Sequence, residues 1–259
     1  MVSRLGWTRG QLLIAFGLYC QLPFGRMHSR NPEIVKYADL IDRSPSALAM
    51  KLTNIASLDP AITSTGRSGL SGASAADNAM WREMHNDWDR FALEIDAAFQ
   101  RLESTNPKDI QDSTGAGIDD DIDYSGKSKS AVTKVRVGQA FFRRAVLSAH
   151  GYRCCITGLA VPKLLLASHI VPWRADEKNR LNPRNGLSLS ALHDRAFDEG
   201  IITLDEDYRV QVTKNIATEG DQFFASAIAS FHGTRIELPQ KFRPDQSFLQ
   251  HHRDKYYKG

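Results

Sequence analysis

The sequence has 259 residues, of which 42% are hydrophobic, and this length and composition predict two modest domains that each bury a core. The formal net charge of +3 is too small to identify a polyanionic partner by itself. The three cysteines, Cys20, Cys154 and Cys155, form no spaced CxxC pair. This argues against a disulfide framework and a four-cysteine zinc site, and it makes a reducing cytoplasm the simplest setting.

The charge is spread unevenly along the chain. Residues 131–259 hold 19 Lys and Arg against 13 Asp and Glu, whereas residues 102–130 hold 3 against 7. A basic C-terminal half is compatible with a polyanionic substrate, although many solvated surfaces have the same balance. The charge pattern therefore leaves both interpretations open.

The first apolar run is Leu12–Cys20, which follows Arg4 and Arg9. A secretory signal is disfavoured because no small-residue cleavage site follows the run, and the run is too short to span a bilayer. Thr8 and Gln11 have the spacing of a capping box, in which each side chain satisfies a free backbone N–H. We therefore expect a core helix over about residues 9–20 and no membrane partner.

Two more helix starts follow. Asn31-Pro32-Glu33 combines an N-cap, a proline at the first helical position and an acidic first turn. Ser44-Pro45 repeats the signal, and Asp59-Pro60 stops the helix that it begins. The result is three short helices with a tight turn between the last two, which resembles a helix-turn-helix arrangement.

In a helix-turn-helix the second helix of the pair presents side chains to DNA. Here it would present Ser46, Lys51 and Asn54, which are residue types that contact phosphates or base edges. The alternative is a small helical bundle whose polar face is merely hydrated. Lys51 and Asn54 are therefore candidate DNA-binding residues.

A run after Asp77 follows a heptad pattern of large apolar side chains: Trp81, Met84, Trp88, Phe91, Ile95 and Leu102. This pattern predicts one long amphipathic helix. Its apolar seam packs either on the N-terminal helices or on a second copy of the chain, and the second alternative predicts a homodimer.

The apolar pattern is lost from Ser104 to Ser130, where the sequence holds several Gly and Ser residues and the acidic run Asp119–Asp121. Such a composition is typical of a flexible linker. We therefore expect a helical domain over residues 1–102, a flexible acidic linker over 103–131 and a further domain over 132–259.

Regular segments reappear in the second half. A helix is predicted over about residues 137–147, and an apolar strand over 164–171 is interrupted by one histidine, His169. A hairpin is predicted over 201–204 and 208–212.

A loop separates this strand from a dense turn signal at Asn182–Gly186. A short apolar strand over 187–189 follows, and Ser190 is placed to cap a helix over 191–199. The predicted order is therefore strand, loop, strand and helix.

Four ordered sequence blocks lie within this arrangement: Arg153–Gly158, Ala167–Trp173, Asn185–Leu189 and His193–Gly200. Together they resemble the HNH (ββα-metal) endonucleases that are grouped as predicted restriction enzymes. The resemblance covers roughly residues 135–213, and the tail from Leu238 to Arg253 looks like the usual ending of that group. It implies an α+β protein in which a helical N-terminal domain precedes an HNH nuclease domain with a C-terminal extension.

The resemblance also implies a role for each signature residue. His169 matches the general base, a neutral imidazole that accepts a proton from the water attacking a phosphodiester phosphorus. Asn185 matches the residue that braces the loop so that the base is aimed, and His193 matches a ligand of one divalent cation. Mg²⁺ is the expected ion because it suits hard phosphate oxygens, although a histidine ligand also admits Mn²⁺, Ni²⁺ or Zn²⁺.

The chain departs from the family pattern in two places. Many members carry Asp or His before the base, where this chain has Ser168, so the expected metal ligands are His193, Ser168 and Asp198, with Asp194 as a further carboxylate. Asp198 pairs with an arginine in the alternative interpretation. Cys154-x-x-Thr157 stands where many members have zinc knuckles, so we expect no structural zinc and buried, unreactive cysteines.

Arg174 and Arg195 flank the proposed site, and we expect them to bind DNA phosphates. Ion pairs with neighbouring acids are the alternative. His251 and His252 have no ligand-type partners at useful spacing and are expected at the surface.

These expectations combine into one functional hypothesis. The resemblance implies metal-dependent hydrolysis of double-stranded DNA, in restriction or in defence against foreign DNA. Two alternatives remain: a DNA-binding regulator that keeps the nuclease scaffold without turnover, and an HNH nuclease toxin without sequence preference.

Overall fold

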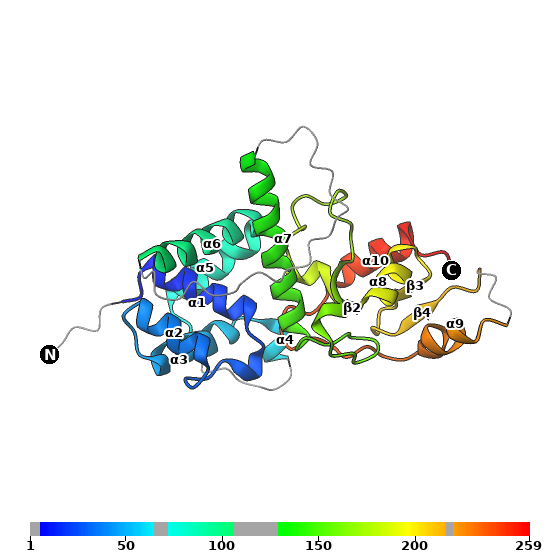
Figure 1. The fold of residues 1–259 in the computed structure, drawn as a ribbon, viewed down its shortest axis with the longest axis horizontal. Coiled ribbons are helices and arrows are strands. Elements are labelled where there is room, and N and C mark those ends of the chain that lie inside the picture. Colours follow the sequence, from blue (N-terminus) through cyan, green and yellow to red (C-terminus); the bar gives the residue numbers. More distant parts are fainter. Residues whose placement is uncertain (1–5, 65–71, 106–128, 216–219) are drawn as a thin grey trace. The chain divides into compact units, whose positions relative to one another are not determined.

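A computed structural model of the chain describes residues 6–64, 72–105, 129–215 and 220–259 (Figure 1). The chain forms two compact units, residues 1–145 and 146–259. The described part of the first unit is helical, and the second combines two β-hairpins with helices, so the chain is α+β as predicted. Residues 106–128 of the predicted linker lie outside the described residues.

The N-terminal unit follows the predicted caps. Thr8 and Gln11 form a capping box, the Asn31 side chain accepts from the Glu33 N–H, and Ser44 accepts from the Ala47 N–H. The helices are α1 (Arg9–Gln21), α2 (Pro32–Leu40), α3 (Pro45–Ala56), α4 (Pro60–Thr63), α5 (Ala75–Asn86), α6 (Trp88–Thr105) and the greater part of α7 (Lys129–Ala149), with a 3₁₀ turn at Phe24–Arg26.

Helix α1 is the central helix of this unit, and its residues Leu12–Cys20 are buried on all sides. Gly17 allows α6 to approach closely, because a Cβ atom at this position would overlap the rings and methyls of Phe99 and Ile95. The predicted core helix is confirmed. No helix in the described part of the chain is long and apolar enough to cross a membrane.

The predicted single long helix after Asp77 is wrong, because the chain forms two helices that break at Asp87. Asp87 has φ −152° and ψ 88°, which interrupts the helical hydrogen bonds. Its carboxylate then accepts from the Arg90 N–H, and its carbonyl accepts from the Phe91 N–H, which starts α6. The apolar seam packs inside the chain, with α6 against α1 and α5.

Lys51 does not lie on an exposed face of α3, so its prediction as a DNA-binding residue is wrong. It is 6% exposed, and its ammonium group donates to both carboxylate oxygens of Asp77 at 2.9 Å. Asp77 is fully buried and also accepts from Ser74 at the start of α5, while Trp7 lies under the Lys51 ammonium at 5.0 Å. The lysine therefore fastens α3 to α5 instead of facing a ligand.

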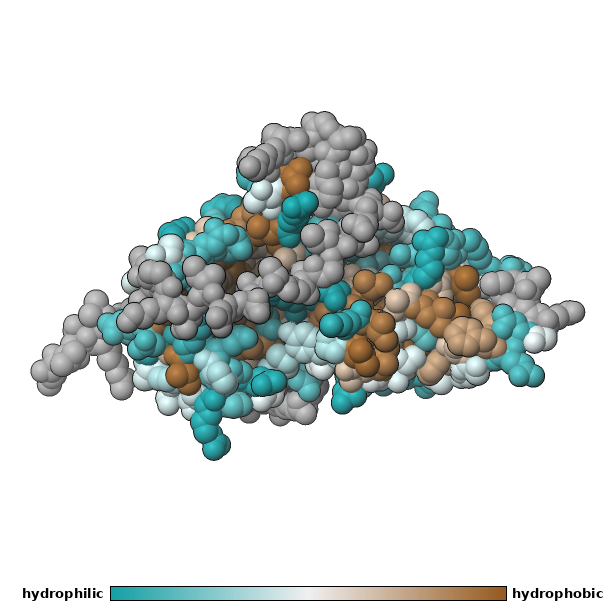
Figure 2. All heavy atoms as spheres, viewed as in Figure 1, coloured by the Kyte–Doolittle hydropathy of each residue, from teal (hydrophilic) through white to brown (hydrophobic). Residues whose placement is uncertain are grey.

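Hydrophilic side chains cover most of the face that Figure 2 shows, and hydrophobic ones gather over part of the C-terminal unit. Six large hydrophobic side chains are exposed in the described part of the chain. Four of them belong to this unit: Val161, Leu164, Leu192 and Phe223.

The C-terminal unit contains a β-hairpin that is followed directly by a helix. Strands β1 (Leu165–His169) and β2 (Gly186–Ser190) pair antiparallel, and α8 (Ala191–Asp198) follows β2 directly. Strands β3 (Ile202–Leu204) and β4 (Val210–Val212) form the second hairpin. This order confirms the predicted strand, loop, strand, helix and hairpin. The remaining elements are α9 (Gln222–Ala227), α10 (Gln246–Lys255) and 3₁₀ turns at Pro162–Leu164, Pro183–Asn185 and Ala229–Phe231.

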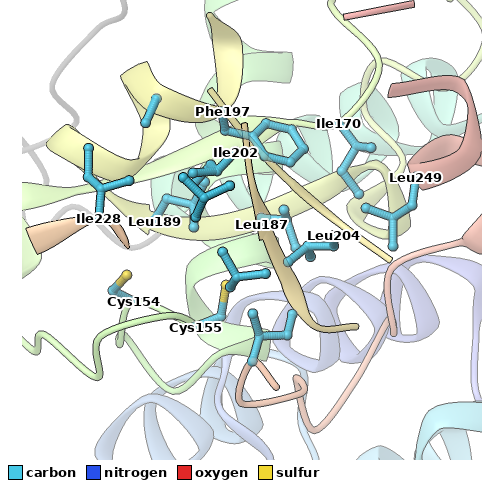
Figure 3. Close-up of a cluster of buried hydrophobic side chains, with 14 of the residues drawn as sticks. Cys154, Cys155, Ile170, Leu187, Leu189, Phe197, Ile202, Leu204, Ile228 and Leu249 are labelled. Atoms are coloured by element: carbon cyan, nitrogen blue, oxygen red, sulfur yellow. The ribbon is translucent and has the colours of Figure 1, made fainter. Parts of the chain in front are cut away.

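One hydrophobic core joins both hairpins, α8 and α10 (Figure 3). Leu187 and Leu189 of β2 enter it beside Phe197 of α8, and Leu249 enters it from α10. Cys154 and Cys155 are buried members of this core and are free thiols, and burial raises the pKa of Cys155. The prediction of buried, unpaired cysteines is confirmed.

The buried Lys51–Asp77 pair gives a prediction about stability. Lys51→Met should lower the free energy of unfolding by about 3 kcal/mol, because it leaves a buried carboxylate without its counter-ion. The matched control is Lys36→Met, since Lys36 pairs with Glu103 at 3.7 Å on the surface. Its cost should be below about 1 kcal/mol. Urea unfolding followed by tryptophan fluorescence measures both, and equal losses would contradict the interpretation.

Candidate active site

The first hairpin and α8 place the three signature residues. His169 is the last residue of β1 and lies opposite Gly186. Asn185 ends the turn that precedes β2, and His193 lies in the first turn of α8. The Ser190 hydroxyl caps α8 by accepting from the His193 N–H, so the strand and the helix meet at a fixed point.

The His169 ring is held by a backbone carbonyl. Its Nε2 lies 2.9 Å from the carbonyl oxygen of Arg180. Because a carbonyl oxygen can only accept, this hydrogen bond places the proton on Nε2 and the basic lone pair on Nδ1. Burial lowers the pKa of His169 to about 4, against the opposing effect of the Arg180 carbonyl. The imidazole is therefore neutral near pH 7, which is the form that a general base requires.

Asn185 braces the loop that leads from His169 to Arg180. The residue is fully buried; its Oδ1 accepts from the Val171 N–H at 2.8 Å, and its Nδ2 donates to the Val171 carbonyl at 3.0 Å. The same Nδ2 donates to the Asn179 carbonyl at 3.4 Å. One amide side chain thus ties together the two ends of this loop.

The loop is also organised from within. Asp176 accepts from the backbone N–H groups of Lys178 and Asn179 and from the Asn179 side chain at 2.7 Å. Asn182 donates to the Asn179 side chain at 3.2 Å and accepts from the Arg184 N–H. Hydrogen bonds from these short polar side chains stabilise the loop, in place of the backbone hydrogen bonds that a helix or strand would have.

His193 points into the protein. It is 3% exposed and shares the buried stripe of α8 with Ala196 and Phe197. Its Nδ1 lies 2.8 Å from the Ser190 hydroxyl, and its Nε2 is buried without a hydrogen bond among the described residues. Burial lowers the pKa of His193 below its ordinary value. Because the pKa lies below 6.5, the ring is mostly neutral at pH 7, and neutral imidazole is the form that binds a metal ion.

The other predicted metal ligands lie in different settings. Ser168 is 4% exposed, and its hydroxyl has no hydrogen bond among the described residues. Ser168 directly precedes His169 in β1, and successive side chains of a strand point to opposite faces. Ser168 therefore faces the other side of the hairpin from His169. Asp198 is exposed, and its side chain leaves α8 roughly 140° from that of His193. Half-buried Asp194 is one turn before Asp198 and shares its face.

These residues can hold a divalent cation only if the protein supplies one or two of its ligands and water or substrate supplies the rest. Within the described ranges, no three His, Cys, Asp or Glu side chains lie close enough to hold a metal ion. The buried, unpaired His193 Nε2 and Ser168 Oγ are the kind of polar atoms that a water or an ion satisfies. Mg²⁺ commonly binds one or two carboxylates and completes its shell with water and substrate phosphates.

The predicted DNA-binding residues differ in exposure. Arg174 is exposed in the loop after β1. The Arg195 side chain is 72% exposed and pairs with Glu199 at 2.7 Å, which is the alternative that the sequence left open. Asn54 is half-buried, and its side chain lies close to Gly72.

Asp245 supports the site from outside the signature blocks, and no sequence motif indicated this role. Its carboxylate binds the Arg184 guanidinium at 2.8 Å, and its N–H donates to the Arg184 carbonyl at 3.0 Å. Asp245 therefore fixes both the side chain and the backbone of Arg184, the residue that precedes Asn185.

His252 is buried, so the expectation that it lies at the surface is wrong. It is 2% exposed, and its ring stacks on Phe197 of α8 with the centroids 3.7 Å apart. Nε2 donates to the Phe197 carbonyl at 3.1 Å, and Nδ1 accepts from the Thr203 hydroxyl at 2.9 Å. A tertiary partner 55 residues away in the chain explains why sequence spacing did not reveal this role.

The hairpin, the following helix and the His-Asn-His arrangement define the ββα class of nuclease folds. Residues 154–205 match the family model for the HNH endonuclease. They therefore form an HNH endonuclease domain within the C-terminal unit.

Other comparisons are more distant. Comparison with the curated proteins gives no match. Among solved structures, the chain is similar to a "Modification dependent TagI restriction endonuclease", with 18% sequence identity and a TM-score of 0.36. The match covers 46% of this chain and 38% of that enzyme's chain.

The Asn185 bonds predict a local effect on the loop. Asn185→Ala should lower the free energy of unfolding by about 2–4 kcal/mol, because it leaves both backbone groups of Val171 buried and unpaired. Hydrogen exchange of the Val171 amide should also accelerate. Asn215→Ala is the control, since Asn215 is exposed and its side-chain Nδ2 donates to the Lys258 carbonyl at 2.8 Å. An unchanged Val171 exchange rate would show that Asn185 does not hold the loop.

The burial of His252 predicts a dependence of stability on pH. Burial lowers its pKa from 6.5 to about 4, so the folded state binds fewer protons than the unfolded state between these values. Stability should therefore fall as the pH drops from about 6.5 towards 4. In His252→Gln the slope should be shallower by up to about 1.4 kcal/mol per pH unit. Urea unfolding across this range measures both slopes, and identical slopes would contradict the assignment.

Proposed function

We propose that this protein is a metal-dependent endonuclease that hydrolyses phosphodiester bonds of double-stranded DNA. The observation that carries the proposal is the hydrogen bond from His169 Nε2 to the Arg180 carbonyl. This bond keeps the proton on Nε2 and leaves Nδ1 able to accept one. The neutral imidazole at the end of β1 therefore has the tautomer that a general base requires.

In this mechanism His169 Nδ1 accepts a proton from a water molecule, and the water oxygen attacks phosphorus in line with the leaving 3′ oxygen. The Arg180 carbonyl stabilises the imidazolium that forms, because it accepts from Nε2–H throughout. Asn185 is a positioning residue, since it holds the loop that carries this carbonyl. The products are 5′-phosphate and 3′-hydroxyl ends.

HNH nucleases generally use a divalent metal, and the proposed ion is Mg²⁺, with Mn²⁺, Ni²⁺ or Zn²⁺ as alternatives. When bound, it supplies a Lewis acid that stabilises charge on the phosphate and the leaving oxygen. The proposed ligands are His193, Ser168 and Asp198. Asp194 is included because it shares a helix face with Asp198 and is half-buried.

The proposed DNA contacts come from exposed basic side chains. Arg174 and Arg195 both reach solvent, and Arg195 can exchange its surface partner Glu199 for a phosphate at little cost. Asn54 remains a proposed contact of the N-terminal unit. A homodimer, which would bring two sites to the two DNA strands, stays a prediction.

The proposed role is restriction or defence against foreign DNA. A DNA-binding regulator with an inactive scaffold is the second candidate, and it is favoured by the lack of a three-residue metal cluster in the described parts of the chain. Metal titration separates the two candidates. Tight DNA binding without metal affinity or cleavage supports the regulator, and smeared cleavage products support a nuclease without sequence preference.

The test of the proposal is cleavage of unmodified and phage-modified DNAs with Mg²⁺ or Mn²⁺. The wild-type protein should cut at least one of them, and His169→Ala should lower the rate at least about 100-fold because the general base is lost. His28→Ala is the control, since His28 is an exposed histidine of the other unit. No cleavage by the wild type, or equal cleavage by His169→Ala, would overturn the assignment.

A further inference from the structure

Trp173 makes two ring contacts that together enclose the proposed base. Its indole meets the His169 ring edge to face, with the centroids 5.7 Å apart and the planes at 90°. The Arg180 guanidinium lies over the same indole, 5.1 Å from the ring centroid. The Arg180 carbonyl accepts from His169 Nε2, so these three residues form a closed set of contacts.

The hydrogen bond to Arg180 does not fix the His169 ring by itself. The terminal torsion of a histidine side chain is broad, so the hydrogen bond to the Arg180 carbonyl fixes the position of Nε2 but does not define the tilt of the ring plane. An aromatic edge at a right angle to the imidazole restricts this tilt, since edge-to-face geometry is favoured by the ring quadrupoles. Trp173 also fixes the position of Arg180, because the guanidinium stacks on the indole face.

Among the described residues of its unit, Trp173 lies outside the hydrophobic core cluster. The core includes residues of both hairpins, α8 and α10, but neither the buried cluster nor the side chains packed against it include Trp173. The residue is half-buried in a loop that is otherwise organised by polar side chains. A large aromatic residue in such a place is better explained by its contacts with His169 and Arg180 than by core packing.

We propose that Trp173 is a positioning residue for His169, which holds the imidazole in the orientation that directs Nδ1 at the attacking water. The inference rests on the proposed nuclease function. Trp173 itself acts through His169 and the Arg180 carbonyl and does not touch the reacting phosphate.

The experiment compares Trp173→Leu and Trp173→Phe with the wild type in metal-dependent DNA cleavage. Trp173→Leu should lower kcat roughly 10- to 100-fold with KM within about twofold, because a misaimed base slows the chemical step without weakening DNA binding. Trp173→Phe should recover most of kcat, since a phenyl ring keeps the edge-to-face contact. The control is Trp81→Leu, which removes another half-buried tryptophan, in the N-terminal unit, and should leave kcat unchanged.

A wild-type kcat in Trp173→Leu would overturn the inference. So would a raised KM with unchanged kcat, which would make Trp173 a DNA contact, or a loss of activity that only follows a loss of stability in urea unfolding. NMR of the His169 ring nitrogens tests the inference without activity. The wild type should show protonated Nε2 and unprotonated Nδ1, and Trp173→Leu should show a mixture of tautomers. A wild type that cleaves no DNA overturns the proposed function, whereas identical NMR spectra overturn the role of Trp173.

Discussion

The candidate site depends on one buried amide. Asn185 is excluded from solvent, and a buried amide without partners is costly, so its hydrogen bonds must be satisfied by nearby backbone. It binds both backbone groups of Val171 and the carbonyl of Asn179, which closes the loop between them. The next carbonyl, that of Arg180, then meets His169. The orientation of the proposed base thus depends on Asn185 through the backbone of a loop and not through direct contact.

The segment after the HNH domain completes the fold of the site. The family match ends at residue 205, yet Asp245 fixes the turn beside Asn185 and His252 stacks on Phe197 of α8. A ββα motif of this size buries little apolar surface by itself and often requires a further stabilising element. In this chain the packed C-terminal extension supplies that element, because Leu249 of α10 enters the same core as the buried thiols of Cys154 and Cys155.

The N-terminal unit shows the limit of helical periodicity as a guide to exposure. Lys51 lies at a polar position of α3, and its type suggested contact with DNA. The fold instead brings Asp77 from α5 next to it, and the pair is buried together. A lysine on a helix can be hydrated or paired inside, and only the position of a distant carboxylate decides between these states.

Local sequence determined where most helices and strands of this protein form and which residues are the candidates for its active site. The caps at Thr8, Asn31 and Ser44 set helix starts by local hydrogen bonds, and the order of strand, turn and helix around His169 and Asn185 follows from apolar runs and turn residues. The break at Asp87, the burial of His252 and the contacts of Trp173 were decided by the tertiary structure. Caps and turns act over a few residues, whereas burial and ring contacts depend on segments that meet only after folding.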